Sequence, residues 1–150
     1  MISMKRLFFF SLLVITVGCN VAMDDDSKAI KAAEQWAEAY FNDDFHKAMK
    51  YATPNSEHWL RFAASNATNE DLQLLDAIPA TVTAEDGFAI ANDTMRVVTL
   101  HINNYLGNTA LGNSAKQEKE GIFHVNVVKH DGEWLVKMEG LPQSEKQSRD

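Results

Sequence analysis

Histidine offers this sequence its widest range of chemistry, because it can exchange a proton or bind a metal near neutral pH. The chain has five, His46, His58, His101, His124 and His130. No two are separated by the two or four positions that place ligands on one face of a strand or helix, so we predict no metal site. His101 and His124 fall in the two longest predicted strands, where they are either a proton relay, a weak metal-binding pair, or solvated side chains. The apolar residues that alternate with His101 favour a solvated position.

Aromatic side chains provide a second candidate site. They could line an apolar pocket for a small ligand, or they could form the ordinary core of the domain. Trp59 is the easiest to assign to a ligand site, since Asn55, His58 and Arg61 lie near it. The candidate pocket residues are Trp36, Tyr40, Trp59, Phe62, His101 and His124.

Other catalytic patterns have no support in the sequence. It contains no G-x-S-x-G nucleophile motif and no glycine-rich phosphate loop. We therefore predict no cofactor and no assigned catalytic residue, and expect a protein that is not an enzyme.

The first 18 residues have the three parts of a secretory signal. Lys5 and Arg6 are positive, residues 7–17 are mostly apolar, and Gly18 is small. The apolar run is short for a bilayer span, and no basic cluster follows it, which argues against an uncleaved anchor.

The residues Thr16-Val17-Gly18-Cys19 resemble the bacterial lipobox, although Thr16 stands where leucine is usual. The resemblance implies that Cys19 is lipidated and anchors the protein to the outer membrane, facing either the periplasm or the cell surface. The acidic residues 24–26 resemble the surface-export signals of Bacteroides-type lipoproteins. Alternatively, residues 19–26 are a solvated tether whose acids favour the start of the next helix.

Length and charge exclude several classes of protein. The 150 residues indicate one domain, and 45% hydrophobic content predicts a packed core. The net charge of −7 disfavours nucleic acid as a partner. A single cysteine excludes a disulfide within the chain.

The middle of the chain has the apolar spacing of helices. Asn42-Asp43-Asp44 separates the first two, and Pro54 and Pro79 end later ones. We predict helices over residues 27–41, 45–52, 56–63 and 69–78.

After Pro79 the apolar period becomes two, which indicates strands. Turns are predicted at residues 85–87 and 92–93, and Asp131-Gly132 predicts a hairpin. The predicted strands are residues 82–90, 94–105, 117–130 and 134–139. Helices followed by antiparallel strands predict an α+β domain with helices on one face of a curved sheet. The predicted organisation is a signal (1–18), a lipidated tether (19–26), the domain (27–141) and a flexible tail (142–150).

Two segments resemble the NTF2-like, or cystatin-like, group of small α+β lipoproteins. The first runs from Ala37 through Phe45 and Ala48 to Ala52-Thr53-Pro54, like the two helices that open such domains. The second is residues 125–136, in which Asp131-Gly132-Glu133-Trp134 matches the closing hairpin. The resemblance implies a cone of helices and bent sheet that can enclose a pocket, and a possible homodimer.

The resemblance leaves three functions open. The leading expectation is an envelope lipoprotein that binds a small ligand or a protein partner without catalysis. The second is an immunity or accessory protein for a toxin or an envelope complex. The third is an isomerase or dehydratase, in which Tyr40 would donate to a developing oxyanion.

Overall fold

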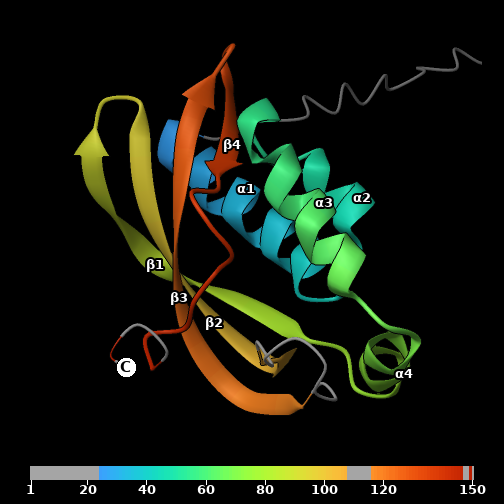
Figure 1. Cartoon of the computed structure of the whole chain (residues 1–150). Coiled ribbons are helices and arrows are strands. Elements are labelled where there is room, and N and C mark those ends of the chain that lie inside the picture. Colours follow the sequence, from blue (N-terminus) through green and yellow to red (C-terminus); the bar gives the residue numbers. More distant parts are fainter. Residues whose placement is uncertain (1–23, 108–115, 147–148, 150) are drawn as a thin grey trace, which may run out of the picture.

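The computed structural model describes residues 24–107, 116–146 and 149. Within them, helices are followed by an antiparallel sheet of order β1-β2-β3-β4, and α1, α2 and α3 lie together on one side of it (Figure 1). The predicted α+β architecture is confirmed. The elements are α1 (Asp25–Tyr40), α2 (Phe45–Met49), the 3-10 helix η1 (Pro54–Ser56), α3 (Glu57–Asn66), α4 (Asn69–Ala77), β1 (Thr81–Asn92), β2 (Met95–Leu106), β3 (Gln117–His130) and β4 (Glu133–Lys137).

The predicted signal and Cys19 lie outside the described residues. None of the helices in the described ranges is long and apolar enough to span a membrane.

Helix α1 begins two residues earlier than predicted. The Asp24 carboxylate accepts a hydrogen bond from the backbone N–H of Ser27 at 2.8 Å and so caps the helix. Asp25 and Asp26 then lie in the first turn, where negative charge is favoured by the helix dipole. The acidic run is therefore in part helical and serves the start of α1.

The start of α1 is also tied to the sheet by charge. Asp25 Oδ2 lies 2.8 Å from Lys129 Nζ on β3, and Asp26 Oδ1 lies 3.0 Å from Arg96 Nε on β2. Arg96 is also packed over the ring of Trp134, with 5.2 Å between the guanidinium carbon and the ring centroid. These contacts hold the beginning of the domain at one end of the sheet.

The buried face of α1 changes in size along the helix. Ala29, Ala32 and Ala33 are buried near its start, whereas Trp36 and Phe41 are the large buried residues toward its end. Ala37 and Ala39 are buried there as well, so large rings and small side chains alternate toward the end of the helix, whereas only small side chains face the core at its start.

The segment between α2 and η1 attaches the helices to the last strand. Thr53 N–H donates to the carbonyl of Val136 at 2.9 Å, and Val136 N–H donates to the carbonyl of Tyr51 at 2.8 Å. Ser56 Oγ accepts from the backbone N–H of Met138 at 2.8 Å. The helical half is thus hydrogen-bonded directly to β4.

Two turn predictions have different outcomes. The hairpin at Asp131-Gly132 is confirmed, with φ of 48° and 83°, the left-handed region that both central residues of a type I′ turn require. The turn predicted at residues 85–87 is wrong: β1 runs on from Thr81 to Asn92, with a register shift between Ala84 and Phe88. A bulge of this kind absorbs extra residues without ending the strand.

The predicted flexible tail is partly attached to the sheet. Ser144 forms an isolated antiparallel bridge with Phe123, and Glu145 N–H donates to the carbonyl of Ile122 at 2.9 Å. Residues 138–145 therefore leave the end of β4 and return to β3 at Phe123 and Ile122. We call this segment the strap.

Gly121 on β3 makes room for Tyr105 on β2. An ideal Cβ at Gly121 would lie 2.8 Å from Tyr105 Cε1 and Oη. Tyr105 is only 5% exposed and contacts Phe123 and Phe41, with ring centroids 5.1 and 6.0 Å away. A side chain at residue 121 therefore cannot be accommodated by a simple movement of the tyrosine.

We expect Gly121→Ala to lower the free energy of unfolding by about 1–3 kcal/mol, because it overpacks this contact. A decrease in the free energy of unfolding would be informative, because alanine ordinarily stabilises a strand relative to glycine. The measurement is urea denaturation followed by tryptophan fluorescence. Gly140→Ala is the matched control, because an ideal Cβ there has no atom within 4 Å. Equal stability of the two variants would contradict the packing argument.

Candidate functional site

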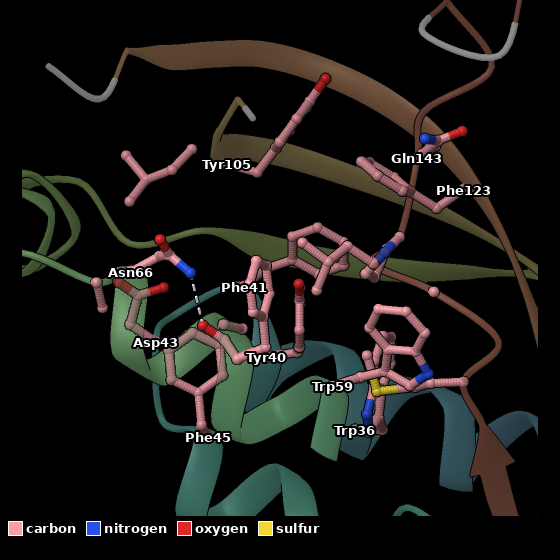
Figure 2. Close-up of a pocket in the computed structure, with 18 of the residues that line it drawn as sticks. Trp36, Tyr40, Phe41, Asp43, Phe45, Trp59, Asn66, Tyr105, Phe123 and Gln143 are labelled. Atoms are coloured by element: carbon pink, nitrogen blue, oxygen red, sulfur yellow. Dashed lines mark hydrogen bonds between the residues drawn. The ribbon is translucent and has the colours of Figure 1, made fainter. Parts of the chain in front are cut away.

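A cavity of about 1170 Å³ lies between the helices and the sheet. Its walls come from the end of α1, from α3 and the start of α4, from β2 and β3, and from the strap. Figure 2 shows Asp43 and Phe45 at one end of the cavity and Trp36 and Trp59 toward the other, with Tyr105 and Phe123 on the sheet side. The cavity lies on the side where α1 presents its larger residues.

Aromatic rings form a continuous wall. Tyr40 stacks on Trp36, with centroids 4.9 Å apart and an interplanar angle of 18°. It also meets Phe41 and Phe45 edge to face, at 5.2 and 5.5 Å. Phe41 continues the wall to Phe123 on β3 at 4.8 Å. Edge-to-face and offset contacts of this kind fix the rings relative to one another.

Some of the aromatic residues belong to the core of the domain, and others line the cavity without being fully buried. Trp36 and Phe41 are buried and belong to the core as well as to the wall. Tyr40 and Trp59 are only partly buried and line the cavity, and Phe62 is 49% exposed at its edge.

The structure brings together most of the predicted pocket residues. Trp36, Tyr40, Trp59 and Phe62 all line the cavity, and His124 lies at its edge. His101 is not among the lining residues.

The two histidines lie diagonally across neighbouring strands. His124 is opposite Thr99, and His101 is opposite Ile122. His101 Nε2 lies 2.7 Å from Glu85 Oε1. His101 and His124 therefore contact different side chains and not each other. The described residues contain no group of three His, Cys, Asp or Glu side chains that could hold a metal ion.

His124 connects the sheet to the strap. Its Nδ1 lies 3.0 Å from Thr99 Oγ1, and its Nε2 lies 2.8 Å from Glu145 Oε1. Together with the backbone bond from Glu145 to Ile122, this contact fixes the far end of the strap, which forms one side of the cavity.

Sequence reasoning missed two carboxylates at the other end of the cavity. Asp43 lies between α1 and α2 and has φ of 59°, a left-handed conformation that aspartate tolerates better than most residues. Asp71 is buried at the start of α4, where its carboxylate accepts a hydrogen bond from Thr68 N–H at 2.8 Å and completes a capping box. The available signal was an acidic break flanked by aromatic residues, Tyr40 and Phe45 among them.

Burial and charge act together on these groups. Burial, and then the negative charge of Asp71, raise the pKa of Asp43 to about 6. Burial, and then the negative charge of Asp43, raise the pKa of Tyr40 above its ordinary value. Tyr40 therefore stays neutral at physiological pH, whereas Asp43 titrates just below it.

Comparison with known proteins finds similar solved structures but no similar sequence among family models or curated proteins. One similar solved structure is an NTF-2 like protein of unknown function from Shewanella oneidensis MR-1, with a TM-score of 0.47 and 13% identity over 73% of this chain and 92% of that one. Another is an Ntf2 like protein involved in plasmid conjugation, with a TM-score of 0.40 and 15% identity over 79% of this chain and 48% of that one. Both are NTF2-like proteins, the group that the sequence resembles.

The raised pKa of Asp43 predicts a pH-dependent effect of Asp43→Asn. Because folding raises this pKa from 3.8 to about 6, the folded state holds its proton more tightly, and the side chain destabilises the fold as pH rises through this window. Asparagine also tolerates the left-handed conformation. Solvent screens a half-buried group, so we expect the variant to be more stable by about 1 kcal/mol at pH 8 and no different below pH 3.8.

The measurement is denaturant unfolding at both pH values. Asp76→Asn on α4 is the control, because Asp76 is exposed and outside the cavity. An Asp43→Asn variant that gains no stability at pH 8 would contradict the electrostatic account.

Proposed function

We propose that the chain is a lipid-anchored envelope protein whose domain binds a small, largely apolar molecule in the cavity. The observation that carries the proposal is the aromatic-walled cavity of about 1170 Å³. Ligand pockets are typically about 300–1,000 Å³ and mostly apolar, with a few polar groups that orient the ligand. This cavity is slightly larger, and it combines an aromatic wall with many polar residues, Asp43 and Asp71 among them.

The surrounding contacts keep the cavity open. Its helical wall is hydrogen-bonded to β4 at Thr53 and Val136, and the strap is attached at both ends through Met138 and Glu145. The rings of Phe41 and Phe123 hold the end of α1 off the sheet. A preformed space of this kind spares a ligand the cost of opening it.

The charge distribution supports binding without catalysis. Tyr40 lines the cavity, which is the placement that the isomerase alternative requires. However, an oxyanion forming there would meet the negative charge of Asp43, and burial followed by this charge already raises the pKa of the Tyr40 hydroxyl. Oxyanion stabilisation needs donors and positive potential at the developing charge. The neighbouring carboxylates supply the opposite.

The proposed anchor is Cys19, at the outer membrane. Its support is the signal-like pattern of residues 1–18 and the lipobox resemblance at residues 16–19, shortly before the helix that Asp24 caps. Residues 20–23 would then be the connection between lipid and domain.

Filling the cavity tests the binding function. Ala63 on α3 lines the cavity, whereas its neighbour Ala64 is exposed outside it. We expect native mass spectrometry of the full chain, produced in a host that processes lipoproteins, to show a bound small molecule. The bound mass should persist in Ala64→Trp and be absent from Ala63→Trp. A wild-type chain that is free of ligand, or that carries only a protein partner, would contradict the proposal, as would an unchanged ligand in Ala63→Trp.

Cys19→Ser tests the anchor separately. We expect the variant to lose incorporation of labelled fatty acid and to move from the membrane fraction to the soluble fraction, because the thiol that accepts the lipid is gone. Unchanged lipid labelling would show that Cys19 is not the lipidated residue.

A further inference from the structure

The cavity is chemically uneven along its length. At the end near Phe45 its wall carries Asp43, Glu70 and Asp71, whereas Trp36 and Trp59 lie toward the other end. Figure 2 shows Asp43 beside Phe45 and away from the two tryptophans, with Tyr40 between them and stacked on Trp36. An apolar ligand lying along the aromatic wall would therefore have one of its ends among carboxylates.

The basic groups of the cavity do not neutralise these carboxylates. Lys137 Nζ lies 3.0 Å from Glu139 Oε1, and His124 Nε2 lies 2.8 Å from Glu145 Oε1, so both are already paired with acids at the strap. Across the part of the chain that the structure describes, no lysine, arginine or histidine forms an ion pair with Asp43 or Asp71.

The two carboxylates are partly withdrawn from water and repel each other. Asp71 is buried, and its Oδ2 accepts the hydrogen bond from Thr68 N–H. A carboxylate has two oxygens, so Asp71 keeps further acceptor capacity. Burial, and then the charge of Asp71, raise the pKa of Asp43 to about 6, so the ionised form of Asp43 is disfavoured here. A positive group placed at this end would relieve both effects.

The aromatic neighbours suit the same kind of group. The faces and edges of Tyr40 and Phe45 meet at 5.5 Å beside Asp43, and an aromatic face attracts a cation through its quadrupole. Carboxylates combined with aromatic rings bind an alkylammonium group more strongly than either does alone in a partly desolvated site. An anionic ligand would have to be buried against this charge.

We propose that the cavity selects a molecule with one positively charged nitrogen and an apolar body, with the nitrogen at the Asp43, Asp71 and Tyr40 end and the body along the aromatic wall. This inference rests on the proposed binding function and adds the chemical class of the ligand. Selection arises because the cation offsets charge that the fold leaves unpaired, whereas neutral and anionic molecules of the same shape do not.

The test compares three probes of matched shape with the full-length chain at pH 7.5. They are 2-(1-naphthyl)ethylamine, which is cationic, 2-(1-naphthyl)ethanol, which is neutral, and 1-naphthylacetate, which is anionic. Binding is measured by isothermal titration calorimetry in a nonionic detergent. We expect the amine to bind at least tenfold more tightly than the alcohol, and the acetate most weakly.

Variants separate the charge effect from the cavity itself. In Asp43→Asn we expect the affinity for the amine to fall severalfold more than the affinity for the alcohol, so that the preference between the two decreases. Asp76→Asn, with the same loss of charge outside the cavity, should keep the full preference. Equal binding of amine and alcohol to the wild type, or a preference that survives Asp43→Asn, would overturn the inference.

A separate outcome distinguishes failure of the binding function. If the alcohol binds the wild type but not Ala63→Trp, and the amine binds no more tightly, the cavity binds ligands and only the charge selection is wrong. If no probe binds and the wild type is also free of ligand by mass spectrometry, both proposals are overturned.

Discussion

The graded packing of α1 against the sheet is the constraint on which the rest of the structure depends. Alanine side chains face the core at the start of the helix, whereas the rings of Trp36 and Phe41 are buried toward its end, where Phe41 contacts Phe123 on the sheet. Both of these rings line the cavity, and further aromatic rings and the strap complete its walls. The placement of the large side chains at one end of α1 therefore accounts for where the cavity lies.

The helix ends explain why acidic residues gather at one end of the cavity. The break after α1 has to turn the chain sharply, and Asp43 at φ of 59° and the α2 cap at Asp44 both serve that turn. Asp71 serves a capping box on another helix. Each acid has a local structural role, yet the fold places Asp43 and Asp71 on one cavity wall, where their charges add. An electrostatic property of the site thus comes from residues whose separate roles are those of helix ends.

That origin also defines how far the sequence could predict the molecule. Apolar spacing and turn residues predicted the helices, the long strands and the Asp131-Gly132 hairpin, because these depend on neighbours along the chain. The bulge in β1 and the return of the strap to β3 depend on pairing with distant strands, so the sequence predicted a turn at residues 85–87 and a flexible tail over residues 142–150. Four aromatic pocket residues could be proposed from their type, whereas Asp43 and Asp71 could not, since nothing local shows that two helix ends meet.

The ion pairs at the start of α1 have a consequence for orientation. Asp25 and Asp26 fasten the first helical turn to Lys129 and Arg96, so the chain leaves the domain at a fixed point. On the proposed anchoring, the five steps from Cys19 to Asp24 reach at most roughly 17 Å, so this end of the domain would lie within that distance of the lipid-bearing residue. The 16 residues of α1 then carry the Asp43 end of the cavity about 24 Å farther along the helix. On that anchoring, the tethered end of the domain and the acidic end of the cavity would lie about one length of α1 apart.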